Sequence, residues 1–222
     1  MMVVEVKWID KIKPFLFAAI VIPTNNLNNW KIEQFSSIPK NEITISSRGL
    51  LIKVHNSAGP LIFPFKSKSK ISGFKIVGEF MGLPKFMNPL LQGEKGFDDY
   101  PLRVGFVVPG KRKLSGIKKM FAAQWVKHLY EQVPDEAGLD SVRFFNVTQN
   151  SKQLDQERTH PNSDLLYEYF FVEVKSVGLF TYEFKFKQPI EVVAVWISID
   201  GDDTKSKFEV LISSIELQLP LP

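Results

Sequence analysis

The densest group of side chains able to do chemistry is an acidic turn at residues 200–204, with the sequence AspGlyAspAspThr. Three carboxylates this close together repel one another unless a positive charge neutralises them. Calcium takes oxygen ligands from short loops of this kind, so Asp200, Asp202 and Asp203 could hold Ca²⁺. The commoner meaning is a solvated turn, in which Asp and Gly are turn-forming residues and nearby lysines balance the charge. The spacing and the terminal Glu of an EF-hand loop are missing.

A second acidic pair, Asp98 and Asp99, comes just before Arg103 at the entrance of an expected strand. Residues 99 and 103 share parity and therefore point to the same face of a strand. In a straight strand they would lie about 13 Å apart, so a direct ion pair requires the chain to bend at Pro101. We therefore expect Arg103 to meet a different acidic group.

The acidic turn is the best candidate for that partner, through Asp200 or Asp202. An arginine held between two Asp-rich loops would first of all brace their conformation. The alternative is a ligand site, in which the arginine binds an acidic or hydroxylated group. The residues of that candidate ligand site are Asp98, Asp99, Tyr100 and Arg103.

Other catalytic patterns are missing from the sequence. It contains no cysteine, no nucleophile elbow, no phosphate-binding or dinucleotide-binding glycine motif and no zinc-binding H-E-x-x-H motif. His55, His128 and His160 fall in different expected elements, so a shared metal ion is not expected. Among them His160 is best suited to acid–base chemistry, together with Glu157 and Asp155. An enzyme hypothesis therefore lacks both a nucleophile and a cofactor signature, and no cofactor is expected beyond the possible Ca²⁺.

The elements that would position these residues are mainly β-strands. Phe180, Tyr182, Phe184 and Phe186 alternate with polar residues, which predicts a half-buried strand. Residues 190–199 are apolar on both parities and predict a central strand covered on both sides. Further strands are predicted at 50–54, 74–80, 102–108, 167–174 and 208–219. This pattern predicts a mainly β fold: an antiparallel, jelly-roll-like β-sandwich.

One amphipathic helix interrupts the strands. Leu114, Ile117, Phe121, Trp125 and Leu129 recur at helical spacing, so a helix is predicted at about residues 115–132. Such an apolar stripe usually packs on a sheet and does not by itself indicate a cofactor site. The polar stretches at 86–99 and 148–164 predict long surface loops.

Composition bounds the class of protein. The 222 residues are 44% hydrophobic and 23% charged, as in folded globular domains, and the net charge of +4 does not suggest nucleic-acid binding. We expect one domain at 26–222, preceded by a segment 1–25 that is either a strand or a signal-like stretch. The apolar run at 15–22 is far shorter than the about 20 residues of a membrane span, so no transmembrane anchor is expected.

Three blocks of sequence resemble one bacterial family. The first runs from Gly96 to Val108 and contains Asp98, Asp99 and Arg103 before a hydrophobic strand. The second is the helical stretch 121–129, followed by Pro134 and a strand at 142–147. The third is the acidic turn at 200–204, where Asp203 replaces the family's Asn. Together with residues 30–35, these blocks resemble domain of unknown function 3047 over nearly the whole chain.

This resemblance implies a jelly-roll-like sandwich of the kind seen in carbohydrate-binding modules, often exported to the periplasm or outside the cell, with no established activity. Our first hypothesis is accordingly a non-catalytic module for a saccharide or another polar cell-envelope ligand. Sugar faces stack on aromatic rings, and the candidate aromatics are Trp30, Tyr100, Tyr130 and Tyr167. A glycan-active lyase or hydrolase is the second hypothesis, and a structural or protein-interaction domain is the third.

Overall fold

The computed structural model describes residues 18–35, 37–113, 127, 130, 138–161 and 163–221. Within these residues the regular secondary structure is almost entirely β-strand. The strands are β1 (Ala19–Ile22), β2 (Lys31–Ile32), β3 (Glu42–Ser46), β4 (Gly49–His55), β5 (Pro60–Met81), β6 (Leu102–Gly110), β7 (Gly138–Thr148), β8 (Glu157–Thr159), β9 (Leu166–Glu173), β10 (Gly178–Ser198) and β11 (Lys207–Gln218). Two short 3-10 helices are η1 (Pro89–Leu91) and η2 (Ser151–Gln153).

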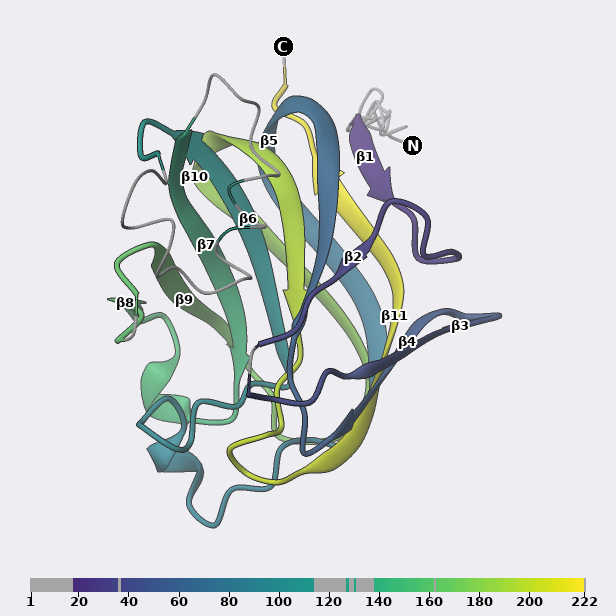
Figure 1. The fold of residues 1–222 in the computed structure, drawn as a ribbon, viewed down its shortest axis with the longest axis vertical. Helices are drawn as coiled ribbons and strands as arrows, with labels where there is room; N and C mark the ends of the chain where they lie inside the picture. Colours follow the sequence, from purple (N-terminus) through teal and green to yellow (C-terminus); the bar gives the residue numbers. More distant parts are fainter. Residues whose placement is uncertain are drawn as a thin grey trace, which may run out of the picture.

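The two longest strands, β5 and β10, lie side by side at the centre of the sheet (Figure 1). They pair antiparallel from Gly178↔Phe80 at one end to Ser198↔Pro60 at the other. The complete order is β3-β4-β11-β5-β10-β6-β7-β9-β8, with β1 added beside β11 and β2 beside β5. The second half of β5 thus lies between β11 and the first half of β10, whereas the second half of β10 lies between the first half of β5 and β6.

The sheet folds back on itself, because rings from strands that are not neighbours in the sheet touch. Phe145 of β7 lies 4.7 Å from Phe184 of β10, measured between ring centroids, and Tyr169 of β9 lies 5.2 Å from the same ring. Phe74 of β5 contacts both Phe145 and Phe184. The two layers therefore enclose an aromatic core, and the predicted antiparallel β-sandwich is confirmed. The pair β7–β9 is parallel and departs from the otherwise antiparallel arrangement.

The strand patterns read from the sequence agree with burial in the structure. Val192 to Ile199 is buried throughout, as expected of a central strand between β5 and β6. In the first half of β10, Phe180 is buried and Tyr182, Phe184 and Phe186 are half-buried, whereas the intervening residues are exposed. Alternation thus identified the face that packs into the aromatic core.

The layer formed by β6, β7 and the second half of β10 carries a smaller apolar cluster on its outer face. The cluster includes Val107, Phe144 and Trp196, and Tyr130 and Leu165 pack on it. Most of the helix predicted at 115–132 lies outside the described residues. Of that segment the structure describes Lys127 and Tyr130, both helical. No helix of the described ranges is long and apolar enough to cross a membrane.

The two predicted loops contain short ordered elements. η1 lies in the first loop, and η2 and β8 lie in the second. Gln92 ties the loops together: its Oε1 accepts hydrogen bonds from the backbone N–H groups of Gln149 and Asn150, and its Nε2 donates to the carbonyl of Asp99. At the N-terminal end, residues 19–22 of the expected strand or signal-like segment form β1, which pairs with β11.

Candidate functional site

Arg103, on β6, lies at the centre of a buried ion-pair network. Its Nε lies 3.0 Å from Asp200 Oδ2, its Nη1 lies 3.1 Å from Glu168 Oε1, and its Nη2 lies 3.1 Å from Asp98 Oδ2. The guanidinium also stacks 4.3 Å from the ring centroid of Tyr100. The predicted contact between Arg103 and Asp200 is confirmed, and the chain bends enough for Asp98, though not Asp99, to form an ion pair with Arg103.

A second arginine completes the group that we call the arginine network: Arg103, Arg158, Asp98, Glu168 and Asp200. Nε of Arg158, on β8, donates to Glu168 Oε2 at 2.6 Å, and its Nη2 lies 3.3 Å from Asp98 Oδ1. Glu168 also accepts a hydrogen bond from Asn146 Nδ2 at 2.8 Å. Each carboxylate of the network therefore faces at least one guanidinium, which offsets the cost of burying its charge.

The acidic turn at 200–204 is anchored by Asp99. Its carboxylate accepts hydrogen bonds from the backbone N–H of Thr204 at 2.7 Å and from that residue's hydroxyl at 2.6 Å. In return, the backbone N–H of Asp98 donates to Asp203 Oδ2 at 2.9 Å. The two acidic segments that the sequence singled out thus lie together and support one another.

Burial dominates the electrostatics of this region. It raises the pKa of Asp200 to about 7, although Arg103 acts in the opposite direction. Burial and the neighbouring Asp99 raise the pKa of Asp202 to about 6. Burial alone would also raise the pKa of Asp98, but Arg103 and His160 overcome it and hold that pKa at about 2. Burial thus favours the protonated form of Asp200 near neutral pH, whereas Asp98 stays ionised beside Arg103.

One group of three residues among those described could present ligand atoms to a metal ion: Asp98, His160 and Glu168, whose atoms lie within 4.8 Å of one another. The sequence analysis grouped His160 with Glu157 and Asp155. In the structure His160 instead contacts Asp98 at 2.9 Å. Arg103 and Arg158 already neutralise both carboxylates, so the donor set fits an ion-pair network better than a dication. The Ca²⁺ hypothesis for Asp200, Asp202 and Asp203 stays a prediction.

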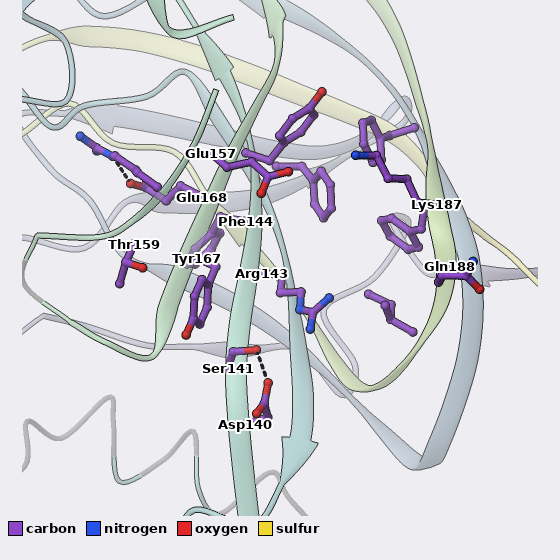
Figure 2. Close-up of a pocket in the computed structure, with 16 residues that line it drawn as sticks. Asp140, Ser141, Arg143, Phe144, Glu157, Thr159, Tyr167, Glu168, Lys187 and Gln188 are labelled. Atoms are coloured by element: carbon purple, nitrogen blue, oxygen red, sulfur yellow. Dashed lines mark hydrogen bonds and ion pairs between the residues drawn. The ribbon is translucent and has the colours of Figure 1, made fainter. Parts of the chain in front are cut away.

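A pocket of about 860 Å³, which Arg158 and Glu168 of the network help to line, lies between β7, β8 and β9 on one side and the middle of β10 on the other (Figure 2). We call it the sheet pocket. Its lining residues are Asp140, Ser141, Arg143, Phe144, Phe145, Glu157, Arg158, Thr159, Tyr167, Glu168, Tyr169, Phe184, Phe186, Lys187, Gln188 and Ile190. The volume is in the range of small-molecule sites, about 300–1,000 Å³.

Strand register explains why these residues share one pocket. Arg143 and Phe145 pair in parallel with Tyr167 and Tyr169, so their side chains lie on the face that looks toward β10. On β10 the pairing with β5 is interrupted between Lys185 and Ile190. Such a bulge re-aims side chains, and it places Phe186 and the polar pair that follows it at the opposite wall.

The pocket combines an apolar floor with an exposed polar rim. Tyr169, Phe184 and Phe186 are half-buried, and Tyr167 remains 43% exposed. The rim residues Arg143, Glu157, Thr159, Lys187 and Gln188 are all exposed. In Figure 2 the side chains of Arg143 and Lys187 extend into the space between β7 and β10. Rings and partly solvated polar groups converge here on one concave surface.

The sequence located the network better than the pocket. Of the four aromatics proposed for sugar stacking, Trp30 and Tyr100 are buried, Tyr130 is half-buried, and Tyr167 alone lines the pocket. The candidate ligand residues Asp99, Tyr100 and Arg103 are buried, and Asp98 is half-buried beneath the surface. Glu168 and Arg143 were missed, although a charged residue in an aromatic strand was a usable signal for each.

No family model and no curated protein matches the chain, so the resemblance to domain of unknown function 3047 stays a prediction. Solved structures with a similar arrangement include the xylan-binding module CBM15, at 12% identity and a TM-score of 0.39, covering 91% of this chain and 97% of that one. The carbohydrate recognition domain of Emp47p has 11% identity and a TM-score of 0.39, with coverages of 90% and 95%.

A third similar structure is the Crh5 transglycosylase in complex with NAG, at 7% identity and a TM-score of 0.38, covering 92% of this chain and 85% of that one. At TM-scores of this size, none of these similarities carries an argument about function. The functional argument therefore rests on the pocket itself.

Proposed function

We propose that this protein is a non-catalytic binding module for a saccharide, held in the sheet pocket. The observation that carries the proposal is the combination of Tyr167, Tyr169, Phe184 and Phe186 with exposed polar groups around one concave surface. Pyranose rings have apolar faces that stack on aromatic side chains, while their hydroxyl groups need hydrogen-bonding partners. The pocket offers both kinds of contact within about 860 Å³.

A binding role is favoured over glycan cleavage by the state of the buried carboxylates. Glycosidases need two carboxyl groups across a cleft, one of them free to donate a proton. Asp98 and Asp200 are not among the described residues that line the sheet pocket, and Glu168, which does line it, is held by Arg103 at 3.1 Å and by Arg158 at 2.6 Å. The network is therefore better suited to holding two loops and β8 in place beside the pocket.

Two finer proposals remain from the sequence. The first places the ligand at Asp98, Asp99, Tyr100 and Arg103, which would require the loop over these buried side chains to move. The second places Ca²⁺ at Asp200, Asp202 and Asp203. Export to the cell envelope or beyond is also proposed, on the family resemblance alone.

The test is calorimetric titration with a panel of oligosaccharides, with Ca²⁺ present and after chelation. We expect at least one oligosaccharide to bind, and Tyr167→Ala to weaken its binding by up to about tenfold, because stacking on an aromatic ring contributes roughly 0.5–1.5 kcal/mol. Leu179→Ala is the matched control, since Leu179 is 85% exposed and does not line the pocket.

Absence of binding across the panel would count against the function. Equal binding by the Tyr167→Ala variant would move the site away from the sheet pocket. A loss of binding on chelation that Asp202→Ala reproduces would support the Ca²⁺ proposal.

A further inference from the structure

The five arginines of the chain differ in their partners. Arg48 pairs with Glu79, Arg112 pairs with Asp164, and Arg103 and Arg158 belong to the arginine network. Within the described residues, Arg143 forms neither an ion pair nor a hydrogen bond through its side chain. Two arginines line the sheet pocket, Arg143 and Arg158, and among the described residues Arg143 is the one of this pair whose guanidinium is unengaged.

The position of Arg143 is fixed by rigid structure. It lies within β7, between β6 and β9, where it pairs with Phe106 and Tyr167. Its neighbours on the strand, Val142 and Phe144, are buried in the outer apolar cluster. The guanidinium is therefore presented from a central strand beside an aromatic ring and not from a mobile loop.

The opposite wall adds a second cation, Lys187, at the bulge of β10. Three carboxylates also line the pocket. Glu168 is paired with Arg158 at 2.6 Å, Asp140 accepts a hydrogen bond from the Ser141 hydroxyl at 2.8 Å, and Glu157 lies on β8 across from Tyr169. A ligand with one carboxylate and several hydroxyl groups would match this rim. Its carboxylate would meet Arg143, and its hydroxyl groups would donate to Glu157.

We propose that the sheet pocket selects saccharides that carry a carboxylate, namely uronic-acid oligosaccharides, through Arg143. This inference rests on the proposed function and names the ligand class for the same site. A planar guanidinium can bind a carboxylate with two parallel hydrogen bonds, which gives charge-assisted strength and fixes orientation. Tyr167, the cross-strand neighbour of Arg143, would stack on the sugar ring that carries the carboxylate.

The test compares uronic-acid oligosaccharides of several kinds with the same oligosaccharides reduced at the carboxyl carbon to neutral sugars. We expect the acidic form to bind about tenfold more tightly, equivalent to about 1.4 kcal/mol, and the preference to weaken with added salt. Arg143→Gln should abolish the preference while a residual affinity shared by both forms remains. Arg48→Gln, which removes the same charge from an exposed residue outside the pocket, should leave the preference intact.

Two results would overturn the inference without touching the proposed function: neutral sugars that bind as well as the acidic forms, or an acidic preference that survives in Arg143→Gln. Binding of neither form, by wild-type protein with native-like circular dichroism, would overturn both.

Discussion

At the scale of single residues, the arginine network has more carboxylates than guanidinium groups. Asp98, Glu168 and Asp200 face two arginines, and burial leaves little water to stabilise the extra negative charge. Burial, together with the neighbouring Asp99 and Asp202, raises the pKa of Asp200 to about 7, although Arg103 acts in the opposite direction. A proton is therefore part of this network around neutral pH.

This arrangement predicts that stability falls as pH rises. The folded pKa values of Asp200 and Asp202, about 7 and about 6, lie above their ordinary value of 3.8. Their contribution to the free energy of unfolding is thus fully present below that value, and it is lost as pH rises through about 6 to 7. Asp98, with its pKa held at about 2, contributes in the opposite sense, but only in more acidic solution.

Urea unfolding at about pH 5 and about pH 8 measures this effect. We expect wild-type protein to be less stable at the higher pH, and Asp202→Asn to reduce the difference because an amide does not ionise. Asp164→Asn, at an exposed position, should keep the wild-type difference. An unchanged difference in Asp202→Asn would show that this carboxyl group does not carry the effect.

At the scale of elements, Gly105 allows β6 to fit between β7 and β10. A Cβ at this position would lie 2.6 Å from Phe144 Cε1 and 3.2 Å from Trp196 Cβ. Gly105 is two residues from Arg103 on the same face, so a shift of β6 would also disturb the network.

We therefore expect Gly105→Ala to lower the free energy of unfolding by about 1–3 kcal/mol, the usual cost of overpacking a core. Urea unfolding measures it, with Thr181→Ala on an exposed position of β10 as the control. A Gly105→Ala protein as stable as wild type would mean that Phe144 can turn aside at little cost.

The elements show where sequence patterns were sufficient. Alternation identified the buried face of β10 and the fully buried stretch that ends it, because burial imposes these patterns directly. It did not show that residues 178–198 form one strand that passes from one layer to the other, since the bulge near Gln188 interrupts the pattern. β8 was missed because its three residues are polar and owe their position to Tyr169 and Glu168 of β9.

The site follows the same logic. The contact between Arg103 and Asp200 was predictable because both residues lie near strand ends. The sheet pocket was not, because it requires the parallel pairing of β7 with β9 and the bend of β10, and neither leaves a local signal. Glu168 accepts hydrogen bonds from Arg158 on β8 and Asn146 on β7. Because these partners come from other strands, the local sequence offered one signal for Glu168, a charged residue within an aromatic strand.

At the scale of the whole molecule, the layers pack tightly around Phe74 and Phe145 and then separate to form the sheet pocket. The arginine network adjoins this pocket through Arg158 and Glu168, and it connects β8 with the segment before β6 and the turn after β10. In this account the network is structural and the pocket is the binding surface. Tyr167 and Arg143 therefore matter for binding, whereas Arg103 matters for stability.

The most direct test of this division is to map a bound oligosaccharide by the changes in backbone amide NMR shifts during a titration. We predict the largest changes on β7 near Arg143, on β9 near Tyr167 and at the β10 bulge near Gln188, with little change at Asp99 and Arg103. Changes centred on residues 98–103 and the turn at 200–204, with the sheet pocket unaffected, would contradict the account and place the ligand at the loop site instead.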